Sequence, residues 1–117
     1  MASVGAAGNS GVSKMKREFI ERIVTSFLDV IVMAHFRDKS FSGYDVLTFV
    51  QKQHGLLLSP GTVYSRLYSM EREGLIKLVA RRGKKRVYRL TDLGRLMVDV
   101  ATSMDEIKAF IIKIFEQ

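Results

Sequence analysis

Positive charge is concentrated in one short stretch of this sequence, VARRGKKRVYR at 79–89, where six of eleven residues are Lys or Arg. The wider segment 74–91 has seven bases and no acid, so it accounts for the whole net charge of +7. Cations gathered this closely repel one another, and binding to phosphates relieves the repulsion and releases counterions. We therefore predict that five side chains bind the phosphates of duplex DNA: Arg81, Arg82, Lys84, Lys85 and Arg86.

A polar helix surface is predicted just before this cluster. Ser59 is a favourable cap and Pro60 a favourable first helical residue, so a helix should begin here and run to Gly74. Its inner stripe would be Val63, Leu67 and Met70. The opposite face is small or polar and has no acid, which suits close approach to base edges in a major groove. The expected DNA contacts on this helix are Ser59, Gly61, Thr62, Tyr64, Ser65, Tyr68, Ser69 and Arg72.

Two further helices are predicted before this one. Three- and four-residue spacing of apolar residues predicts a helix over 16–36 whose second half is apolar nearly all round, so we expect it to be covered on two sides. A second helix should run over 43–54, between the cap residue Ser42 and Gly55. The inner side of this second helix is expected to contain Tyr44, Leu47, Phe49 and Val50.

Two β-prone runs, 75–80 and 86–90, flank the RRGKK segment and predict a hairpin with the cationic cluster at its tip. The order of helix, helix, capped helix, hairpin and long helix predicts a mainly α fold with a small β-hairpin, an α+β winged helix-turn-helix. We divide the chain into a flexible tail (1–14), a winged-helix domain (15–90) and a C-terminal dimerisation helix (91–117).

An apolar seam is predicted along the last helix, which Thr91 should cap. Its apolar residues recur at alternating spacings of four and three, as in a coiled coil. So small a domain cannot cover this surface by itself, which favours a homodimer. The expected interface residues are Phe27 and Ile31 of the first helix, and Leu93, Met97, Val100, Met104, Ile107, Ile111 and Ile114 of the last.

Several classes of function are disfavoured. The chain has no cysteine, phosphate-binding loop or nucleophile motif, so we expect neither an enzyme nor a bound cofactor. His35 and His54 lack a partner at metal-ligand spacing, and we expect no metal site. Charged residues interrupt the apolar run of the first helix, so no membrane span is expected, and a cytoplasmic location follows.

The segments FSGYDV, LLLSPGTVYSRLYSMEREGLI and YRLTDLGR, spanning about 41–95, resemble the PadR family of transcriptional regulators. The resemblance implies a homodimeric, DNA-binding repressor whose C-terminal helix packs against the partner's N-terminal helix. It also implies that Thr62 and Tyr64 lie at the DNA surface. Two subunits would require a two-fold symmetric operator, with half-sites about one helical turn apart. Some members use a Trp pair to bind drugs between subunits; this chain has no Trp, so a small-molecule effector is not supported.

Two alternatives remain open at this stage. The winged domain could be an adaptor whose basic hairpin docks on an acidic protein, or a non-specific, chromatin-like DNA binder. Competition by generic duplex DNA distinguishes the first from a DNA-binding regulator, and a comparison of duplex sequences distinguishes the second.

Overall fold

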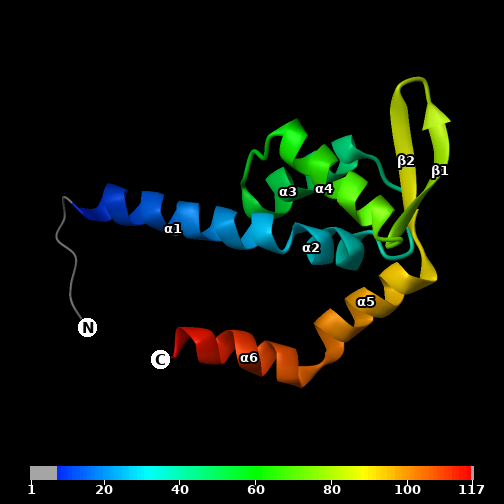
Figure 1. The fold of residues 1–117 in the computed structure, drawn as a ribbon. Helices are drawn as coiled ribbons and strands as arrows, with labels where there is room; N and C mark the ends of the chain where they lie inside the picture. Colours follow the sequence, from blue (N-terminus) through cyan, green and yellow to red (C-terminus); the bar gives the residue numbers. More distant parts are fainter. Residues whose placement is uncertain (1–7, 117) are drawn as a thin grey trace.

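The computed structural model describes residues 8–116, which form six helices and one antiparallel two-stranded sheet (Figure 1). The elements are α1 (Gly8–Ser26), α2 (Leu28–His35), α3 (Gly43–His54), α4 (Pro60–Arg72), β1 (Ile76–Arg82), β2 (Lys85–Leu90), α5 (Asp92–Ser103) and α6 (Asp105–Phe115). Helices α2, α3 and α4 gather at the base of the hairpin, whereas α1 and the α5–α6 pair extend from this unit on one side. This arrangement confirms the predicted winged helix-turn-helix.

A single apolar core joins α2, α3, α4 and the hairpin. The predicted inner stripe of α4 is confirmed, since Val63, Leu67 and Met70 are at most 1% exposed. On the other side of the core, the rings of Phe36 and Phe41 stack at a centroid distance of 4.8 Å. Burial of these side chains is the main stabilising contribution of the domain.

The N-terminal helix differs from the prediction at its start and in its middle. It begins at Gly8 and not at Lys16, so residues 8–14 of the expected tail are helical, while residues 1–7 lie outside the described part. It also breaks at Phe27, so that 16–36 is two helices. At the break, the Thr25 carbonyl accepts a hydrogen bond from Nη2 of Arg66 on α4 at 3.1 Å. Bonding of a helix carbonyl outside its own helix is a common cause of such breaks.

The two central helices begin where the sequence predicts. Ser42 and Asp45 form a reciprocal capping box at the start of α3, and Gly55 ends it with a φ of 66°. Ser59 caps α4 by accepting a hydrogen bond from the Thr62 amide at 3.1 Å. The expected inner side of α3 is partly wrong, because Tyr44 is 66% exposed and Val46 is buried in its place.

The predicted hairpin is confirmed, and its strands are longer than expected. They pair as far as Arg82 and Lys85, which leaves Gly83 and Lys84 as the turn. Gly83 has a φ of 64°, a conformation that glycine adopts at little cost. At the base, Tyr88 exchanges two backbone hydrogen bonds with Phe41, which attaches the hairpin to the loop before α3.

The C-terminal helix is not continuous as predicted. Met104 has an extended backbone, with φ −86° and ψ 115°, and separates α5 from α6. Just before it, the hydroxyls of Thr102 and Ser103 donate to the carbonyls of Val98 and Asp99 four residues back. Such bonds compete with the helical pattern and favour a bend. The apolar seam is therefore divided between two helices.

Candidate nucleic-acid interface

The outer face of α4 is open to solvent. Gly61, Tyr64, Ser65, Tyr68 and Arg72 are exposed. Their side chains include no acid, as the helical spacing predicted. Short side chains at this face let the helix backbone come close to whatever lies against it.

Some of the predicted polar contacts on α4 are already paired with one another. The hydroxyls of Ser59 and Thr62 lie 2.8 Å apart, and Ser59 also caps the helix. At the other end, Nη2 of Arg72 donates to the Ser69 hydroxyl at 3.1 Å. These bonds occupy part of the hydrogen-bonding capacity of Ser59, Thr62 and Ser69 in the absence of a ligand.

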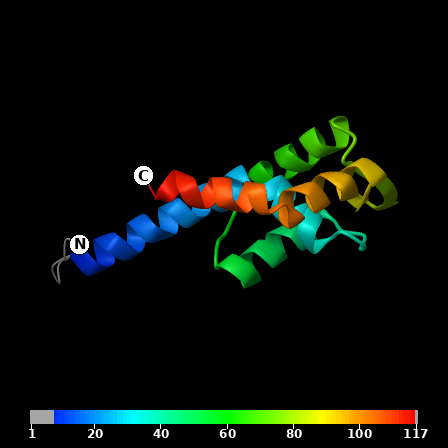
Figure 2. The same cartoon turned by 90° about the horizontal axis from the view of Figure 1, so that it is seen from below.

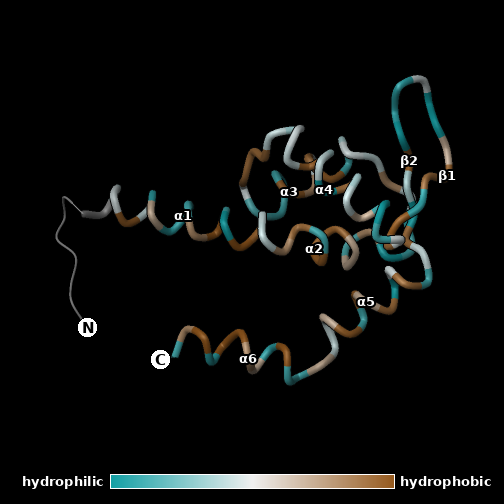
Figure 3. The backbone as a smooth tube through the Cα atoms, viewed as in Figure 1, coloured by the Kyte–Doolittle hydropathy of each residue, from teal (hydrophilic) through white to brown (hydrophobic). Residues whose placement is uncertain are grey.

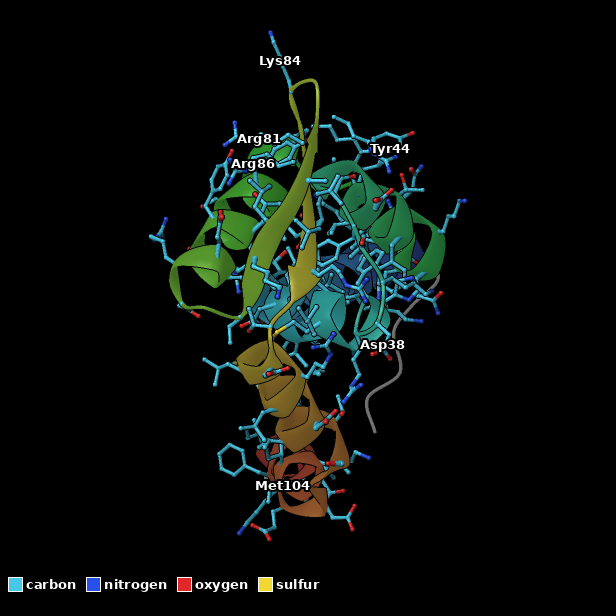
Figure 4. The ribbon with its side chains drawn as sticks, turned by 90° about the vertical axis from the view of Figure 1, so that its right-hand side faces the viewer. Asp38, Tyr44, Arg81, Lys84, Arg86 and Met104 are labelled. Atoms are coloured by element: carbon cyan, nitrogen blue, oxygen red, sulfur yellow. The ribbon has the colours of Figure 1, made fainter. Side chains whose placement is uncertain are left out.

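The hairpin stands beside α4 and extends past it (Figure 4). Lys84 projects from the tip, away from the helices, and Arg81 lies nearer to α4. Four of the five predicted phosphate ligands are exposed and make no ion pair with the described residues: Arg81, Arg82, Lys84 and Lys85. The free cations and the acid-free helix face therefore lie on the same side of the molecule.

A groove of about 360 Å³ separates the hairpin from the helices. It is lined by Tyr64 and Tyr68 of α4, by Lys84, Lys85, Arg86 and Tyr88 of the hairpin, and by Ser42, Gly43 and Tyr44 at the start of α3. Tyrosine rings and cations together make a surface that suits a sugar-phosphate strand. The groove is the place where the two predicted halves of the site meet.

Arg86 differs from the other predicted phosphate ligands. Its Nη2 donates to both carboxylate oxygens of Glu71, at 3.0 and 3.2 Å, and its Nε donates to the phenol oxygen of Tyr88 at 2.8 Å. The hydrogen bond to Tyr88, and then the charge of Glu71, raise the pKa of Arg86 above its usual value. Because the Glu71 carboxylate offsets the charge of Arg86, the net positive charge around the hairpin is smaller than the hairpin sequence suggests.

Tyr64 has a structural contact as well as an exposed edge. Its ring lies against Gly43 so closely that a Cβ at this glycine would overlap it. The ring is 42% exposed, so one edge remains open to the groove. Tyr64 therefore joins α3 to α4 and also faces the candidate site.

The start of α3 is the part of the groove that the sequence analysis missed. Tyr44 was expected on the inner side of the helix and instead lines the groove with Ser42 and Gly43. The sequence signal that could have placed Tyr44 at the groove was its position in the first helical turn, two residues after the cap residue Ser42. Arg66 of α4 faces the N-terminal helices, with its Nη1 3.9 Å from Oδ1 of Asp29 on α2.

The predicted dimer residues lie on α2, α5 and α6 and at the helix breaks Phe27 and Met104, where this chain leaves apolar surface exposed. Seven of the nine are between 37% and 52% exposed: Phe27, Leu93, Met97, Val100, Met104, Ile111 and Ile114. Ile31 and Ile107 are half-buried. Other exposed apolar residues adjoin them, namely Met15, Phe19, Ile20, Ile23, Leu96, Phe110, Ile112 and Phe115.

The helices that bear these residues run antiparallel. The α5–α6 pair returns in the direction opposite to α1–α2 in both views (Figures 1 and 2). Apolar residues recur along these helices, whereas the hairpin tip is hydrophilic (Figure 3). No residue of α6 is buried in the described chain. Exposed apolar surfaces of this extent mark an interaction site.

Other kinds of site were sought in the same residues. Residues 8–116 contain no group of three or more His, Asp or Glu side chains placed to hold a metal ion. Within this range, every helix is too short or too polar to cross a bilayer.

Comparisons with known proteins agree with this geometry. The family model described as the transcriptional regulator PadR-like family matches residues 32–99. A PadR-family regulator from Eggerthella lenta has a similar fold, with a TM-score of 0.67 at 22% identity, over 97% of this chain and 99% of that one. A transcriptional regulator from Clostridium thermocellum gives 0.66 at 19% identity, over 82% and 96% of the two chains.

A third similar structure contains DNA. Bacillus subtilis PadR in complex with operator DNA gives a TM-score of 0.54 at 25% identity, over 61% of this chain and 44% of that one. A search of curated proteins gives no significant match. The family consists of DNA-binding regulators and not of enzymes, as the sequence predicts. Since its model matches more than half of the sequence, this chain belongs to the PadR-like family of transcriptional regulators.

Proposed function

We propose that the chain is a sequence-specific, homodimeric regulator of transcription that acts as a repressor on duplex DNA in the cytoplasm. One observation carries the proposal: the exposed, acid-free face of α4 and the four unpaired cations of the hairpin lie on one side, with a tyrosine-lined groove between them. Repression would follow from occupancy, because a bound dimer blocks access to the DNA that it covers.

In this proposal α4 enters the major groove and the hairpin, or wing, follows the phosphate backbone. Ser65 and Ser69 on α4 would contact base edges and thus read sequence. Arg82, Lys84 and Lys85 would contact phosphates, which strengthens binding to every sequence alike. Bacillus subtilis PadR, a similar structure, was solved in complex with operator DNA, which supports duplex DNA as the ligand.

The proposed dimer pairs α5–α6 of one subunit with α1 of the other. The support is the apolar surface on these three helices, which the described chain leaves exposed. A two-fold symmetric dimer presents two copies of α4 and therefore requires a two-fold symmetric operator, with half-sites about one helical turn apart.

Selection of bound duplexes from a random pool, followed by titration at several salt concentrations, tests the proposal. With four free wing cations in each subunit, log affinity should fall against log salt with a slope of about −7 for the dimer. Recovery of a palindromic sequence supports the regulator. Equal affinity for all duplexes would indicate a non-specific binder, and absence of duplex binding would favour an adaptor for an acidic protein.

A further inference from the structure

Arg86 connects the wing to α4 through several contacts at once. Its Nη2 donates to both carboxylate oxygens of Glu71 on α4, and its Nε donates to Tyr88 of its own strand. The guanidinium lies over two rings, with its central carbon 5.9 Å from the centroid of Tyr68 and 5.6 Å from that of Tyr88. The planar guanidinium holds its Nη2 and Nε donors in a fixed relation, so bonds to Glu71 and Tyr88 at the same time restrict its orientation.

These groups are also shielded from solvent. The side chains of Arg86 and Glu71 are 29% and 31% exposed, and Tyr88 is 2% exposed. Arg81, which lies opposite Arg86 in the hairpin, is exposed and forms no ion pair with residues 8–116. Two neighbouring arginines of one hairpin thus have different environments.

Arg86 lies in the outer part of the hairpin, so its contact with Glu71 can hold that part against α4. The base of the hairpin is held by the Phe41–Tyr88 bridge, and the pairing is irregular between Leu78 and Ala80. Beyond that irregularity the wing is a two-stranded ribbon, and isolated ribbons of this kind are weakly held and readily twisted. Arg86 joins this outer ribbon to α4 through its hydrogen bonds and ion pair with Glu71.

We propose that Arg86, Glu71 and Tyr88 form a brace that sets the position of the wing tip relative to α4. Arg86 is then a positioning residue, which places Arg82, Lys84 and Lys85 against phosphates and does not itself bind one. The inference rests on the proposed DNA binding and adds to it how the two halves of the surface keep their spacing.

Neutralising Glu71 tests the brace, because the brace and simple charge repulsion predict opposite changes in DNA affinity. An acid beside a DNA-binding surface repels phosphates, so its neutralisation alone should strengthen binding. The brace requires the opposite, because Glu71→Gln exchanges an ionic pair for a weaker neutral contact. We expect Glu71→Gln to weaken binding about fivefold, as loss of charge from one such contact implies.

Glu73→Gln is the matched control. Glu73 lies two residues away, is exposed, and forms no ion pair with the described residues. Its neutralisation should leave affinity unchanged or raise it. If Glu71→Gln behaves like Glu73→Gln, the brace is refuted.

Two conservative changes separate positioning from phosphate binding. Arg86→Lys keeps the charge and loses the fork, so a brace predicts a loss of about tenfold, whereas a phosphate contact predicts little change. Tyr88→Phe should also weaken binding, although the residue is too deeply buried to reach DNA. Full affinity in Arg86→Lys or Tyr88→Phe would overturn the proposal.

A measurement without DNA keeps the two proposals distinguishable. Backbone ¹⁵N relaxation at 82–86 should show lower order parameters in Glu71→Gln than in wild type or Glu73→Gln, with unchanged values at α3. If wild type fails to bind duplex DNA while the wing loosens as expected, the proposed function fails and the brace stands. If wild type binds and the wing of Glu71→Gln stays ordered, the brace fails and the function stands.

Discussion

Arg37, just after α2, donates two hydrogen bonds to the carboxylate of Asp99 in α5. Its Nε donates to Oδ1 at 3.1 Å and its Nη2 to Oδ2 at 2.9 Å. The two residues are 62 positions apart, and the pair links α5 to the end of α2, alongside the packing of Val98, which is 2% exposed. The direction of α5 determines where the apolar surface of α5–α6 is presented.

This ion pair should make stability depend on pH. The hydrogen bond from Arg37, together with its charge, lowers the pKa of Asp99 below its ordinary value of 3.8. A lowered pKa in the folded state contributes stability that is present above the unfolded pKa and lost as the pH falls through the folded one. Asp99→Asn should therefore be less stable than wild type near neutral pH, and the difference should shrink as the pH falls below the ordinary Asp pKa of 3.8.

Urea unfolding at several pH values measures this difference. Asp105→Asn is the control, because Asp105 forms no ion pair with the described residues and should show no comparable trend. A gap between wild type and Asp99→Asn that is independent of pH would contradict the assignment.

Two glycines should respond in opposite ways to an added methyl group. A Cβ at Gly43 would overlap the Tyr64 ring, whereas none of the atoms around Gly61 lies within 4 Å of such a Cβ. We expect Gly43→Ala to destabilise the fold by about 1–3 kcal/mol, the usual cost of overpacking. Gly61→Ala should not destabilise it, because Ala favours the helix. Thermal unfolding compares the two variants.

Gly61 also tests the proposed approach of α4 to DNA. The methyl group of Gly61→Ala has room in the free protein and would lie between α4 and the bases in the complex. We expect normal stability together with weaker binding to the selected operator, measured by fluorescence anisotropy. Operator affinity equal to that of wild type would place Gly61 outside the contact surface.

The wing and α4 should make separable contributions to DNA binding. Replacing Arg82, Lys84 and Lys85 together by Ala should weaken all duplexes alike and make the salt slope shallower by about 5 for a dimer. Ser65→Ala or Ser69→Ala should instead change the order of preference among sequences while leaving the slope unaltered. A triple variant that alters preference, or a serine variant that alters only the slope, would reverse the assignment.

A charge on the apolar surface should dissociate the proposed dimer. Met97 on α5 and Ile111 on α6 are 37% and 39% exposed in the described chain. Glu at both positions would be buried without a partner in a dimer, at a cost of several kcal/mol. Light scattering should then give the mass of a monomer.

Leu57→Glu is the control for this experiment. Leu57 is 81% exposed, lies in the loop between α3 and α4, and is not among the residues assigned to the proposed interface. It should leave the mass unchanged. A wild-type protein that is already monomeric at micromolar concentration would remove the basis of the dimer proposal.

Much of the fold follows from local sequence signals. The Ser42 and Ser59 caps, Pro60, and glycines such as Gly55 and Gly83 act within a few residues of themselves, so their effects can be read along the chain. The acid-free face of α4 and the basic wing tip were likewise visible, because a helix and a hairpin have known periods.

Other features depended on contacts between distant residues. The break at Phe27 coincides with a bond from Arg66, and the unexpected burial of Arg86 with a carboxylate fifteen positions away. Arg81 and Arg86 belong to the same basic cluster in the sequence. Only the folded structure distinguishes them, because Arg86 pairs with Glu71 and Arg81 forms no ion pair with the described residues. Amino-acid type and spacing determined the elements and the charge of the surface; tertiary packing decided which charges remain free, because pairing depends on distance in space and not along the chain.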